Sequence, residues 1–340
     1  MTAVALKPVL QKIAVGDALG EDEMRDALEI MTAGEASPVQ MGAFLMGLRV
    51  RGETVPEITA AARLMRAKML RVSAPEGAVD IVGTGGDGHN TFNVSTCAAI
   101  VAAGAGLKIA KHGNRSVSSL SGASDVLAAL GVTLDGSKAA VERCIEEAGA
   151  GFLWAPLYHP AMKVWAPVRA ELGVRSIFNL LGPLTNPASV TRQVVGVFAH
   201  QWVEPIAEVL ANLGSQRAWV VHGYDGLDEL STTGPSSVAE LHDGQITLFD
   251  VTPEDAGLSR ASLEDLKGGT AAKNATALRE VLAGRCCPYR DIVLLNTAAA
   301  LIVGGKAESL AHGVDIAAKS IDSGAAANVL AKLIELSART

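Results

Sequence analysis

Apolar residues in the first part of the chain follow the repeat of amphipathic helices. The stretches MRDALEIM and MGAFLMGL each place their apolar side chains on one helical face. Ser37-Pro38 and Thr54–Pro56 have the composition of helix starts, a capping residue with proline close behind it. We therefore predict a small all-helical domain over residues 1–73.

Methionine side chains form much of the apolar stripes on these helices. The simplest interpretation is that they fill the core of the domain, although a bundle this small can also use one face for contact with a second copy of the chain. The sequence leaves both interpretations open. The methionines concerned are Met24, Met31, Met41, Met46, Met65 and Met69.

After residue 73 the pattern changes to short apolar runs that alternate with amphipathic stretches. Segments such as SKAAVERCIEEAG and QWVEPIAEVLANLG predict helices between the runs, and Asp243-Gly244 predicts a hairpin turn. Residues 273–338 are again helical. We expect an α/β domain over 74–340 with a mainly parallel central sheet flanked by helices. The predicted strands lie near 79–82, 107–110, 151–154, 193–198 and 217–222.

The segment 158–190 interrupts this alternation. It begins with a helical pattern and continues with many Pro, Gly and Asn residues. We expect part of it to return to the helical domain and to complete that domain.

Composition restricts the class of protein. The chain has 340 residues, of which 49% are hydrophobic and 19% charged, enough to bury a large core in two domains. Its formal net charge of −7 argues against nucleic acid as the main partner, because a surface that follows phosphates needs a basic excess. Its most apolar stretches, AAIVAAGAGL and TAAALIVGG, are shorter than the roughly 20 residues of a membrane span.

The N-terminus and the cysteines point to the cytoplasm. The first 20 residues lack the unbroken apolar stretch of a signal peptide. Cys97, Cys144, Cys286 and Cys287 show neither C-x-x-C spacing nor helix-spaced histidine partners. We expect buried free thiols rather than a zinc site or a disulfide framework, and a cytoplasmic protein.

The stretch DIVGTGGDGHNTFNVST, residues 80–96, holds the first candidate site. A glycine cluster between a strand and a helix is typical of a phosphate cradle, although such clusters are as often structural turns. Gly83, Gly85 and Gly88 satisfy the dinucleotide pattern, yet Asp87 would repel a bare phosphate. A P-loop is excluded because no Lys-Ser or Lys-Thr follows the glycines.

The next strand ends in cations instead of the acid that a dinucleotide site requires. The sequence there is KIAKHGNRSVSS, with Lys111, His112 and Arg115, followed by the hydroxyls of Ser116, Ser118 and Ser119. By itself this is as well explained by a solvated turn. Two such loops at the carboxyl ends of neighbouring parallel strands would face one crevice, which a polyphosphorylated sugar would fit.

An acidic loop supplies the third element. The segment HGYDGLDELSTTG follows a predicted strand and carries Asp225, Asp228 and Glu229. Alone it is as well explained by a solvated turn. Beside a pyrophosphate, however, carboxylates are useful, because Mg²⁺ binds one or two of them together with phosphate oxygens. This also explains Asp87 in the glycine loop.

Four motifs in this order resemble the anthranilate phosphoribosyltransferase family, which shares its fold with pyrimidine nucleoside phosphorylases. They are GTGGDGHNTFNVST, KHGNRSVSS with a following SGASD, PVRAELGVRSIFNLLGPLTNP and DGLDEL, and the similarity covers nearly the whole chain. The resemblance implies a homodimer through the helical domains and an active site in the hinge cleft. It also implies Mg²⁺-dependent transfer of the phosphoribosyl group from 5-phosphoribosyl 1-pyrophosphate (PRPP) to the amine of anthranilate, in tryptophan biosynthesis.

The resemblance also implies roles for individual residues. No covalent catalysis is implied; Lys111, Asp228 and Glu229 would stabilise the transition state. Ser95, Asp228 and Glu229 would hold Mg²⁺, with two ions expected. The residues implied in donor binding are Gly83, Gly86, Asp87, Thr91, Asn93, Val94, Ser95, Thr96, Lys111, His112, Gly113, Asn114, Arg115, Ser116, Val117, Ser118, Ser119 and Ala123.

Anthranilate would be bound through Gly83, Asn114 and Arg169. A planar guanidinium suits its carboxylate, whereas helical context alone favours an ion pair of Arg169 with Glu171. His112, Tyr158, His159 and Pro183 are further candidates for the aromatic pocket. The chain departs from the family pattern conservatively, with Ser176 where Thr is common and Val94 where Ile is common.

Three other functions agree less well with the sequence. A pyrimidine nucleoside phosphorylase should lack the acidic pair and the arginine of PVRAELG, and both are present. An inactive relative that binds nucleic acid should show a basic surface and eroded motifs. A purely structural role does not account for three loops rich in Gly, Ser, Lys and Asp.

Overall fold

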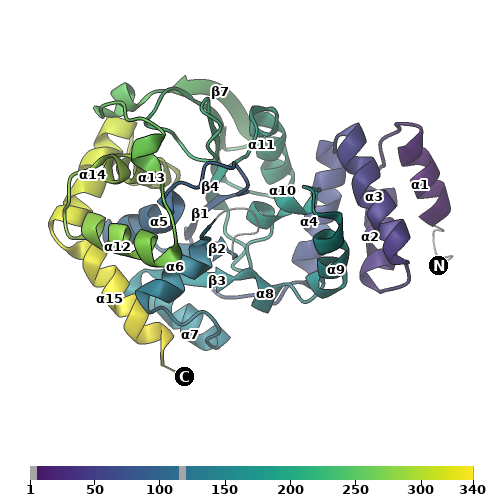
Figure 1. The fold of residues 1–340 in the computed structure, drawn as a ribbon, viewed down its shortest axis with the longest axis horizontal. Coiled ribbons are helices and arrows are strands. Elements are labelled where there is room, and N and C mark those ends of the chain that lie inside the picture. Colours follow the sequence, from purple (N-terminus) through teal and green to yellow (C-terminus); the bar gives the residue numbers. More distant parts are fainter. Residues whose placement is uncertain (1–5, 115–119, 340) are drawn as a thin grey trace.

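The computed structural model describes residues 6–114 and 120–339 of the chain. A helical bundle forms one end of the molecule and an α/β domain forms the other, with the sheet at the centre of the latter (Figure 1). This confirms the predicted fold class, a small helical domain beside a larger domain with a mostly parallel sheet.

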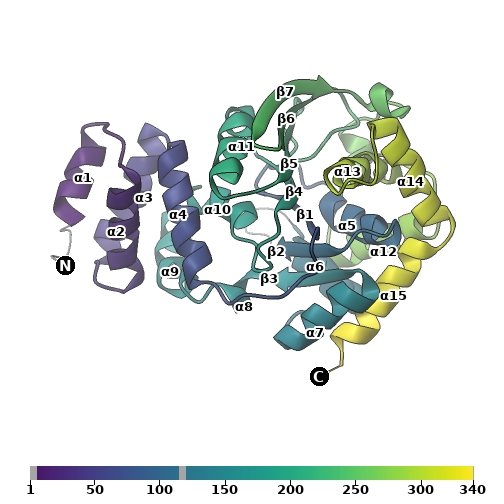
Figure 2. The ribbon, with the colours of Figure 1, turned by 180° about the vertical axis from the view of Figure 1, so that it is seen from behind.

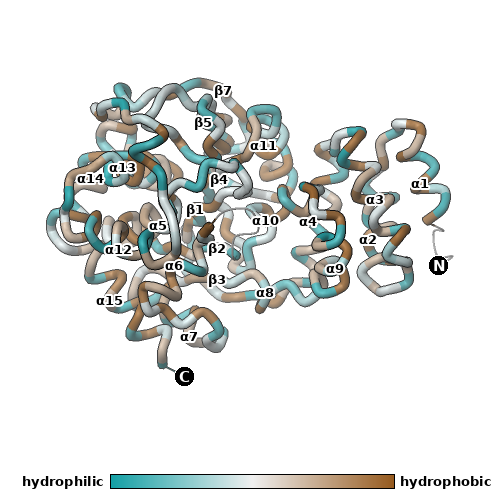
Figure 3. Tube along the Cα trace, viewed as in Figure 1, coloured by the Kyte–Doolittle hydropathy of each residue, from teal (hydrophilic) through white to brown (hydrophobic). Residues whose placement is uncertain are grey.

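Two of the bundle helices, α3 and α4, begin where the sequence predicted helix starts. Ser37 caps α3, where its hydroxyl accepts a hydrogen bond from the Gln40 amide at 3.3 Å, and Pro38 occupies the first turn. In Figure 3 hydrophobic and hydrophilic residues alternate along these helices. Their bounds are α1 Leu6–Ala14, α2 Glu21–Thr32, α3 Pro38–Arg51 and α4 Val55–Lys68.

A buried carboxylate ties the bundle together. Glu57 is fully buried, accepts hydrogen bonds from the amides of Leu19 at 2.8 Å and Thr54 at 2.9 Å, and pairs with Arg51. Since an unpaired buried charge would be costly, these partners make Glu57 a link between the α1–α2 connection and the start of α4.

A helix from the middle of the chain also packs on the bundle. Helix α9, Met162–Leu172, contacts α2 and α3, and its Trp165 is buried with its indole N–H donating to the Thr32 hydroxyl at 3.3 Å. Helix α10, Phe178–Leu184, follows and contacts both α4 and β2. The connection between α9 and α10 therefore runs from the bundle back to the sheet (Figure 2).

One seven-stranded sheet forms the centre of the described α/β domain, in the order β3-β2-β1-β4-β5-β6-β7. Strands β1 to β5 pair in parallel, and β6 and β7 pair antiparallel at one edge. The carboxyl ends of the parallel strands thus meet at one edge, where ligands of open α/β sheets bind. The strands are β1 Val79–Gly83, β2 Ile109–Gly113, β3 Ala150–Trp154, β4 Arg192–Gly196, β5 Arg217–Gly223, β6 Ser236–His242 and β7 Gln245–Val251.

Helices cover both faces of the sheet. On one face α5 and α13 lie in the larger apolar core, and on the other α10 and α11 lie between the sheet and the bundle (Figures 1 and 2). The remaining helices are α5 Val94–Gly104, α6 Ala123–Leu130, α7 Lys138–Arg143, α8 Ala155–Tyr158, α11 Val203–Asn212, α12 Ala271–Leu282, α13 Pro288–Val303, α14 Leu310–Asp322 and α15 Ala325–Ser337.

The second strand lies further along the chain than its apolar residues predicted. The expected strand at 107–110 is observed as Ile109–Gly113. Leu107 instead ends the turn after α5, where its amide donates to the Ala102 carbonyl at 3.1 Å and its side chain joins the helical core. The strand continues through Lys111 and His112, polar residues that the apolar pattern did not mark as strand.

Other expectations are partly confirmed. Asp243 and Gly244 form the predicted hairpin turn with φ of 49° and 79°. Five of the six methionines are buried, and Met46 is half-buried. The expectation of buried thiols is confirmed for Cys97 and Cys144 but is wrong for Cys286, which is exposed, and for Cys287, which is only half-buried.

In the part of the chain that the structure describes, every helix is too short or too polar to cross a membrane.

Close helix packing at Gly104 provides a test of the core. A Cβ built at this last residue of α5 would lie 2.7 Å from the Ala326 amide nitrogen of α15, whereas one at Gly42 in α3 would meet only Leu172 at 3.9 Å. We expect Gly104→Ala to lower the free energy of unfolding by about 1–3 kcal/mol, and Gly42→Ala to raise it by up to about 1 kcal/mol. Urea denaturation measures both, and equal effects of the two substitutions would contradict this packing.

Candidate active site

The glycine loop after β1 presents free backbone donors. Among the described residues, no acceptor binds the amides of Gly86, Asp87 or Gly88. Two hydrogen bonds connect the end of the loop to residues 266–268. The Phe92 amide donates to the Leu266 carbonyl at 3.0 Å, and the Gly268 amide donates to the Asn90 carbonyl at 2.9 Å. Successive free N–H groups in front of a helix form a site for an anion such as phosphate.

The acidic loop lies directly against the ends of β1 and β4. Gly83 and Gly196 are register partners there. A Cβ added to Gly83 would lie 2.3 Å from Asp228 Oδ2, and a Cβ added to Gly196 would lie 1.6 Å from the Asp228 carbonyl oxygen. Asp228 also accepts a hydrogen bond from the Gly85 amide at 2.6 Å. Only glycine at these two positions allows this approach.

Two further residues shape the acidic loop. Asp225 accepts hydrogen bonds from the hydroxyls of Ser231 and Thr233, both at 2.6 Å. Asn296, in the apolar helix α13, accepts from the Leu230 amide at 3.0 Å and donates to the Leu230 carbonyl at 2.8 Å. Asp225 is therefore part of the support for the acidic pair, and Asn296 is a support that the sequence patterns did not reveal.

The three predicted metal-binding residues come together. Glu229 accepts a hydrogen bond from the Ser95 amide at 3.1 Å, and the Lys111 ammonium lies 3.2 Å from the Ser95 hydroxyl. Asp228 and Glu229 are neighbours in the chain, so one contiguous site contains the acidic pair, Ser95 and Lys111.

Burial changes the charge of this site. Burial and its neighbouring carboxylates raise the pKa of Asp228 to about 7 and that of Glu229 to about 8. Burial lowers the pKa of Lys111. Two carboxylates that are costly to ionise side by side suit a divalent cation, which would replace their protons. Among residues 6–114 and 120–339, no cluster of three or more His, Cys, Asp or Glu forms a complete metal site, so the remaining ligands would come from the Ser95 hydroxyl, a substrate and water.

A buried carboxylate lies beneath the site. Asp80 is inaccessible to solvent, and its side chain accepts hydrogen bonds from the His112 amide at 3.1 Å and the Asn186 amide group at 2.7 Å. Burial raises the pKa of Asp80 to about 6, partly offset by the charge of Lys111. No sequence pattern marked Asp80 or Asn186 as part of the site, although a lone acid inside an apolar strand was an available signal for Asp80.

Two buried histidines form a neutral pair. His112 Nε2 lies 3.2 Å from His159 Nε2, and His112 Nδ1 lies 2.9 Å from the Gly182 carbonyl, to which it donates. Burial lowers the pKa of His112 to about 3 and that of His159 to about 4. Tyr158 instead belongs to a separate apolar cluster with Val72.

Arg169 has no ion pair among the described residues, so the alternative of a pair with Glu171 is not observed. Its guanidinium lies 5.2 Å from the ring centre of Phe178. Burial lowers the pKa of Arg169. A half-buried guanidinium on helix α9 is thereby left available to an anion.

The remaining predicted donor residues differ in accessibility. Val94 and Thr96 are buried as whole residues, so their side chains are not accessible to a ligand in this structure. The Asn93 side-chain oxygen accepts a hydrogen bond from the Asn274 side-chain amide at 2.8 Å. Ala123 is the first residue of α6. Thr91, Gly113 and Asn114 lie in the described part of the chain, and the Asn114 carbonyl accepts a hydrogen bond from the Ser124 amide at 3.5 Å. Five residues predicted from the second loop lie outside the described residues, namely Arg115, Ser116, Val117, Ser118 and Ser119.

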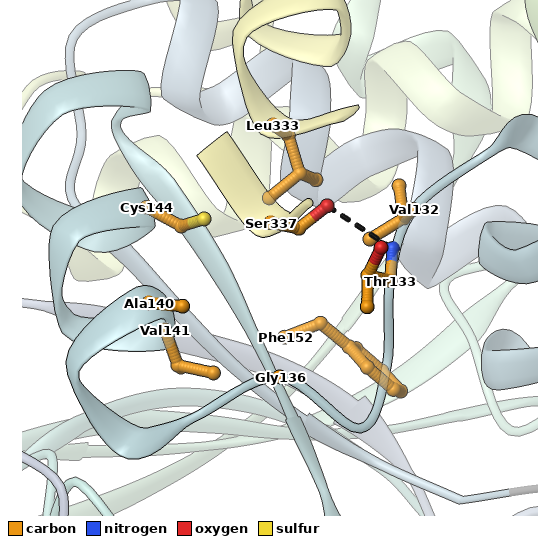
Figure 4. Close-up of a pocket in the computed structure, with 9 residues that line it drawn as sticks. All are labelled: Val132, Thr133, Gly136, Ala140, Val141, Cys144, Phe152, Leu333 and Ser337. Carbon is orange, nitrogen blue, oxygen red and sulfur yellow. Dashed lines mark hydrogen bonds between the residues drawn. The ribbon is translucent and has the colours of Figure 1, made fainter. Parts of the chain in front are cut away.

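A small pocket lies elsewhere in the α/β domain. Phe152, Leu333 and Ser337 are among the residues around it, and the Thr133 amide donates to the Ser337 hydroxyl at 3.0 Å (Figure 4). Its volume of about 10 Å³ holds at most one water molecule. It is therefore too small for a substrate.

Family models match both domains of the chain. The helical bundle domain of a glycosyl transferase family matches residues 7–69, and the α/β domain of the same family matches residues 75–327. A protein of Rhodopseudomonas palustris named anthranilate phosphoribosyltransferase is 61% identical over 97% of this chain and 98% of its own length.

Solved structures agree with these matches. Anthranilate phosphoribosyltransferase from Thermus thermophilus has a TM-score of 0.91 and 45% identity, over 97% of this chain and 99% of its own. The Saccharomyces cerevisiae enzyme in complex with PRPP and Mg has a TM-score of 0.90 and 31% identity, over 98% and 97%. The chain therefore belongs to this glycosyl transferase family and, within it, to the anthranilate phosphoribosyltransferases.

The raised carboxylate pKa values predict the pH dependence of stability. The folded protein keeps protons on Asp228 and Glu229 that the unfolded chain loses near pH 4, so these groups lower stability as the pH rises toward about 8. Asp228→Asn combined with Glu229→Gln should therefore stabilise the metal-free protein by about 1–3 kcal/mol at about pH 8, and by less at about pH 5.5. Urea denaturation in EDTA measures this.

The control for this measurement is Glu171→Gln, which changes an exposed carboxylate on α9. A double variant that is less stable than the unmodified protein at the higher pH, or a difference independent of pH, would contradict the burial of two interacting carboxylates.

Proposed function

We infer that the chain transfers the phosphoribosyl group of PRPP to the amine of anthranilate and releases pyrophosphate, in tryptophan biosynthesis. The observation that carries this inference is the high identity over almost the whole chain to proteins of that name. The site supports it, because free loop amides, an acidic pair and a buried lysine converge at the carboxyl edge of the sheet. The yeast relative is described in complex with PRPP and Mg.

Donor binding is assigned to the glycine loop and the acidic pair. The amides of Gly86, Asp87 and Gly88 would donate to phosphate oxygens, since they have no acceptor among the described residues. Asp228, Glu229 and the Ser95 hydroxyl would hold Mg²⁺, and we propose two ions. When bound, Mg²⁺ would neutralise the pyrophosphate and stabilise the charge of the leaving group.

The chain's own part in the reaction is electrostatic. As the bond from C1 to oxygen breaks, negative charge accumulates on the pyrophosphate and has to be met by fixed donors. Lys111 is placed for this role, because its ammonium touches the Ser95 hydroxyl and its stem is buried in β2. No covalent intermediate is required, since the aromatic amine is itself nucleophilic at neutral pH.

Acceptor binding is assigned to Arg169, with Gly83 and Asn114 as further contacts. A guanidinium can bind both oxygens of a carboxylate, and that of Arg169 has no competing ion pair among the described residues. His112 and His159 are neutral, so they add no charge that would hold the acceptor in the wrong place.

We also propose that the protein is a cytoplasmic homodimer that associates through its helical domain. Val15, Val39 and Val50 are large apolar side chains exposed on that domain, which suits contact with a second copy. Sedimentation at the mass of one chain, 35.0 kDa, would contradict the dimer. Fractionation of the source cells would test the compartment.

Loss of anthranilate fluorescence on addition of PRPP and Mg²⁺ tests the reaction. We expect rapid loss that EDTA abolishes, and Asp228→Asn with Glu229→Gln should lower the rate by about 100-fold or more, because the charges that bind Mg²⁺ are removed. Glu171→Gln serves as the exposed control. A folded, PRPP-binding protein that leaves anthranilate unchanged would refute the assigned acceptor.

A substitution of Arg169 tests the acceptor site. Arg169→Ala should raise the KM for anthranilate by about 10- to 100-fold and leave the KM for PRPP nearly unchanged, because a charged hydrogen bond to the carboxylate is lost. Arg169→Lys should recover only part, since a lysine lacks the planar fork. Steady-state kinetics in both substrates measure this, and an effect confined to PRPP would move Arg169 to the donor site.

A further inference from the structure

Arg175 connects the glycine loop to the segment that returns from the helical bundle. It lies between α9 and α10, and its guanidinium donates to the Gly86 carbonyl. The same group stacks on Phe198, 4.6 Å from the ring centre, just beyond the end of β4. The Phe198 amide in turn donates to the Thr84 hydroxyl at 3.0 Å. Phe198 therefore contacts both Arg175 and the residue at which the glycine loop begins.

The contact fixes one peptide group of the loop. In a trans peptide the carbonyl and the following N–H point in opposite directions, so holding the Gly86 carbonyl toward Arg175 turns the Asp87 N–H away from Arg175. Asp87 N–H has no acceptor among the described residues. The Thr84–Gly85 peptide, two before it, is fixed as well, since the Gly85 amide donates to Asp228 at 2.6 Å.

The conformation of Gly86 depends on this neighbour. Its φ of 81° is a left-handed value that favours glycine, and a Cβ there would lie 3.3 Å from the Arg175 Nε. Without a partner for its carbonyl, a glycine in such a loop would sample many conformations. A lysine could approach the carbonyl but could not also stack flat on the Phe198 ring.

The position of Arg175 in the chain adds a second consequence. Arg169, the proposed acceptor residue, lies on α9, which ends at Gly173, and Arg175 follows directly in the connection. One short segment thus carries both Arg169, the residue proposed to bind anthranilate, and Arg175, which contacts the glycine loop.

We propose that Arg175 is a positioning residue for the donor: by holding the Gly86 carbonyl it orients the Asp87 N–H toward the pyrophosphate of PRPP. This inference rests on the proposed function, because it names a support for that same donor site. The alternative is a surface contact that only stabilises the fold, since Arg175 is exposed. The two roles differ in what a substitution changes.

Arg175→Ala and Arg175→Lys test the proposal, with Arg260→Ala as an exposed arginine control whose partner is Glu254. In Arg175→Ala the KM for PRPP should rise by about 10- to 100-fold, while the KM for anthranilate at saturating PRPP changes by less than about threefold. Arg175→Lys should recover part of the loss. Millimolar guanidinium ion should lower the raised KM of the alanine variant and leave the control unaffected.

Two results would overturn the proposal. One is an unchanged KM for PRPP in Arg175→Ala; the other is an increase in both KM values that accompanies a lowered urea midpoint and is not reversed by guanidinium. Failure of the proposed function has a different signature, because the unmodified protein would then leave anthranilate fluorescence unchanged in PRPP and Mg²⁺.

Discussion

The site depends on the absence of two side chains at the carboxyl edge of the sheet. Gly83 and Gly196 are partners on adjacent strands, and Asp228 occupies the space that their Cβ atoms would take, with its side chain at Gly83 and its backbone at Gly196. This approach lets the Asp228 carboxylate accept the Gly85 amide and brings Glu229 to the start of α5. The acidic loop, the glycine loop and the second strand thereby become one site rather than three separate turns.

Ionisable groups buried at this site lower the stability of the ligand-free fold. Asp228, Glu229 and Asp80 have raised pKa values because they are buried, and the pKa of Lys111 is lowered for the same reason. Lys111 and the carboxylates offset each other in part; a bound cation would add positive charge beside the carboxylates, and a pyrophosphate would add negative charge beside Lys111. Stabilisation of a departing anion requires preorganised charge of this kind, so in the proposed function the same groups that lower the stability of the ligand-free fold would serve the reaction.

The helical domain contributes more than a scaffold. Helix α9 packs on α2 and α3 and carries Arg169, while the residues after it return to the sheet and contact the glycine loop through Arg175. The proposed acceptor cation and the donor loop are thus linked through a single connection. Relative motion of domains is expected at inter-domain contacts of this kind. A movement of the bundle relative to the sheet would therefore shift Arg169 and Arg175, and with them both proposed substrate sites.

Local sequence determined the elements and the composition of the site, and tertiary structure determined how they act. Periodicity predicted the helices of residues 1–73 and the parallel strands, because each element reports which of its faces is apolar. It placed the second strand too early, since Lys111 and His112 are polar yet buried. Ordered motifs marked Asp228, Glu229 and Ser95 as candidates, but not Asp80, Asn296 or Arg175. The positions of these last three depend on contacts between distant segments and on desolvation, which depend on the whole fold and have no local pattern.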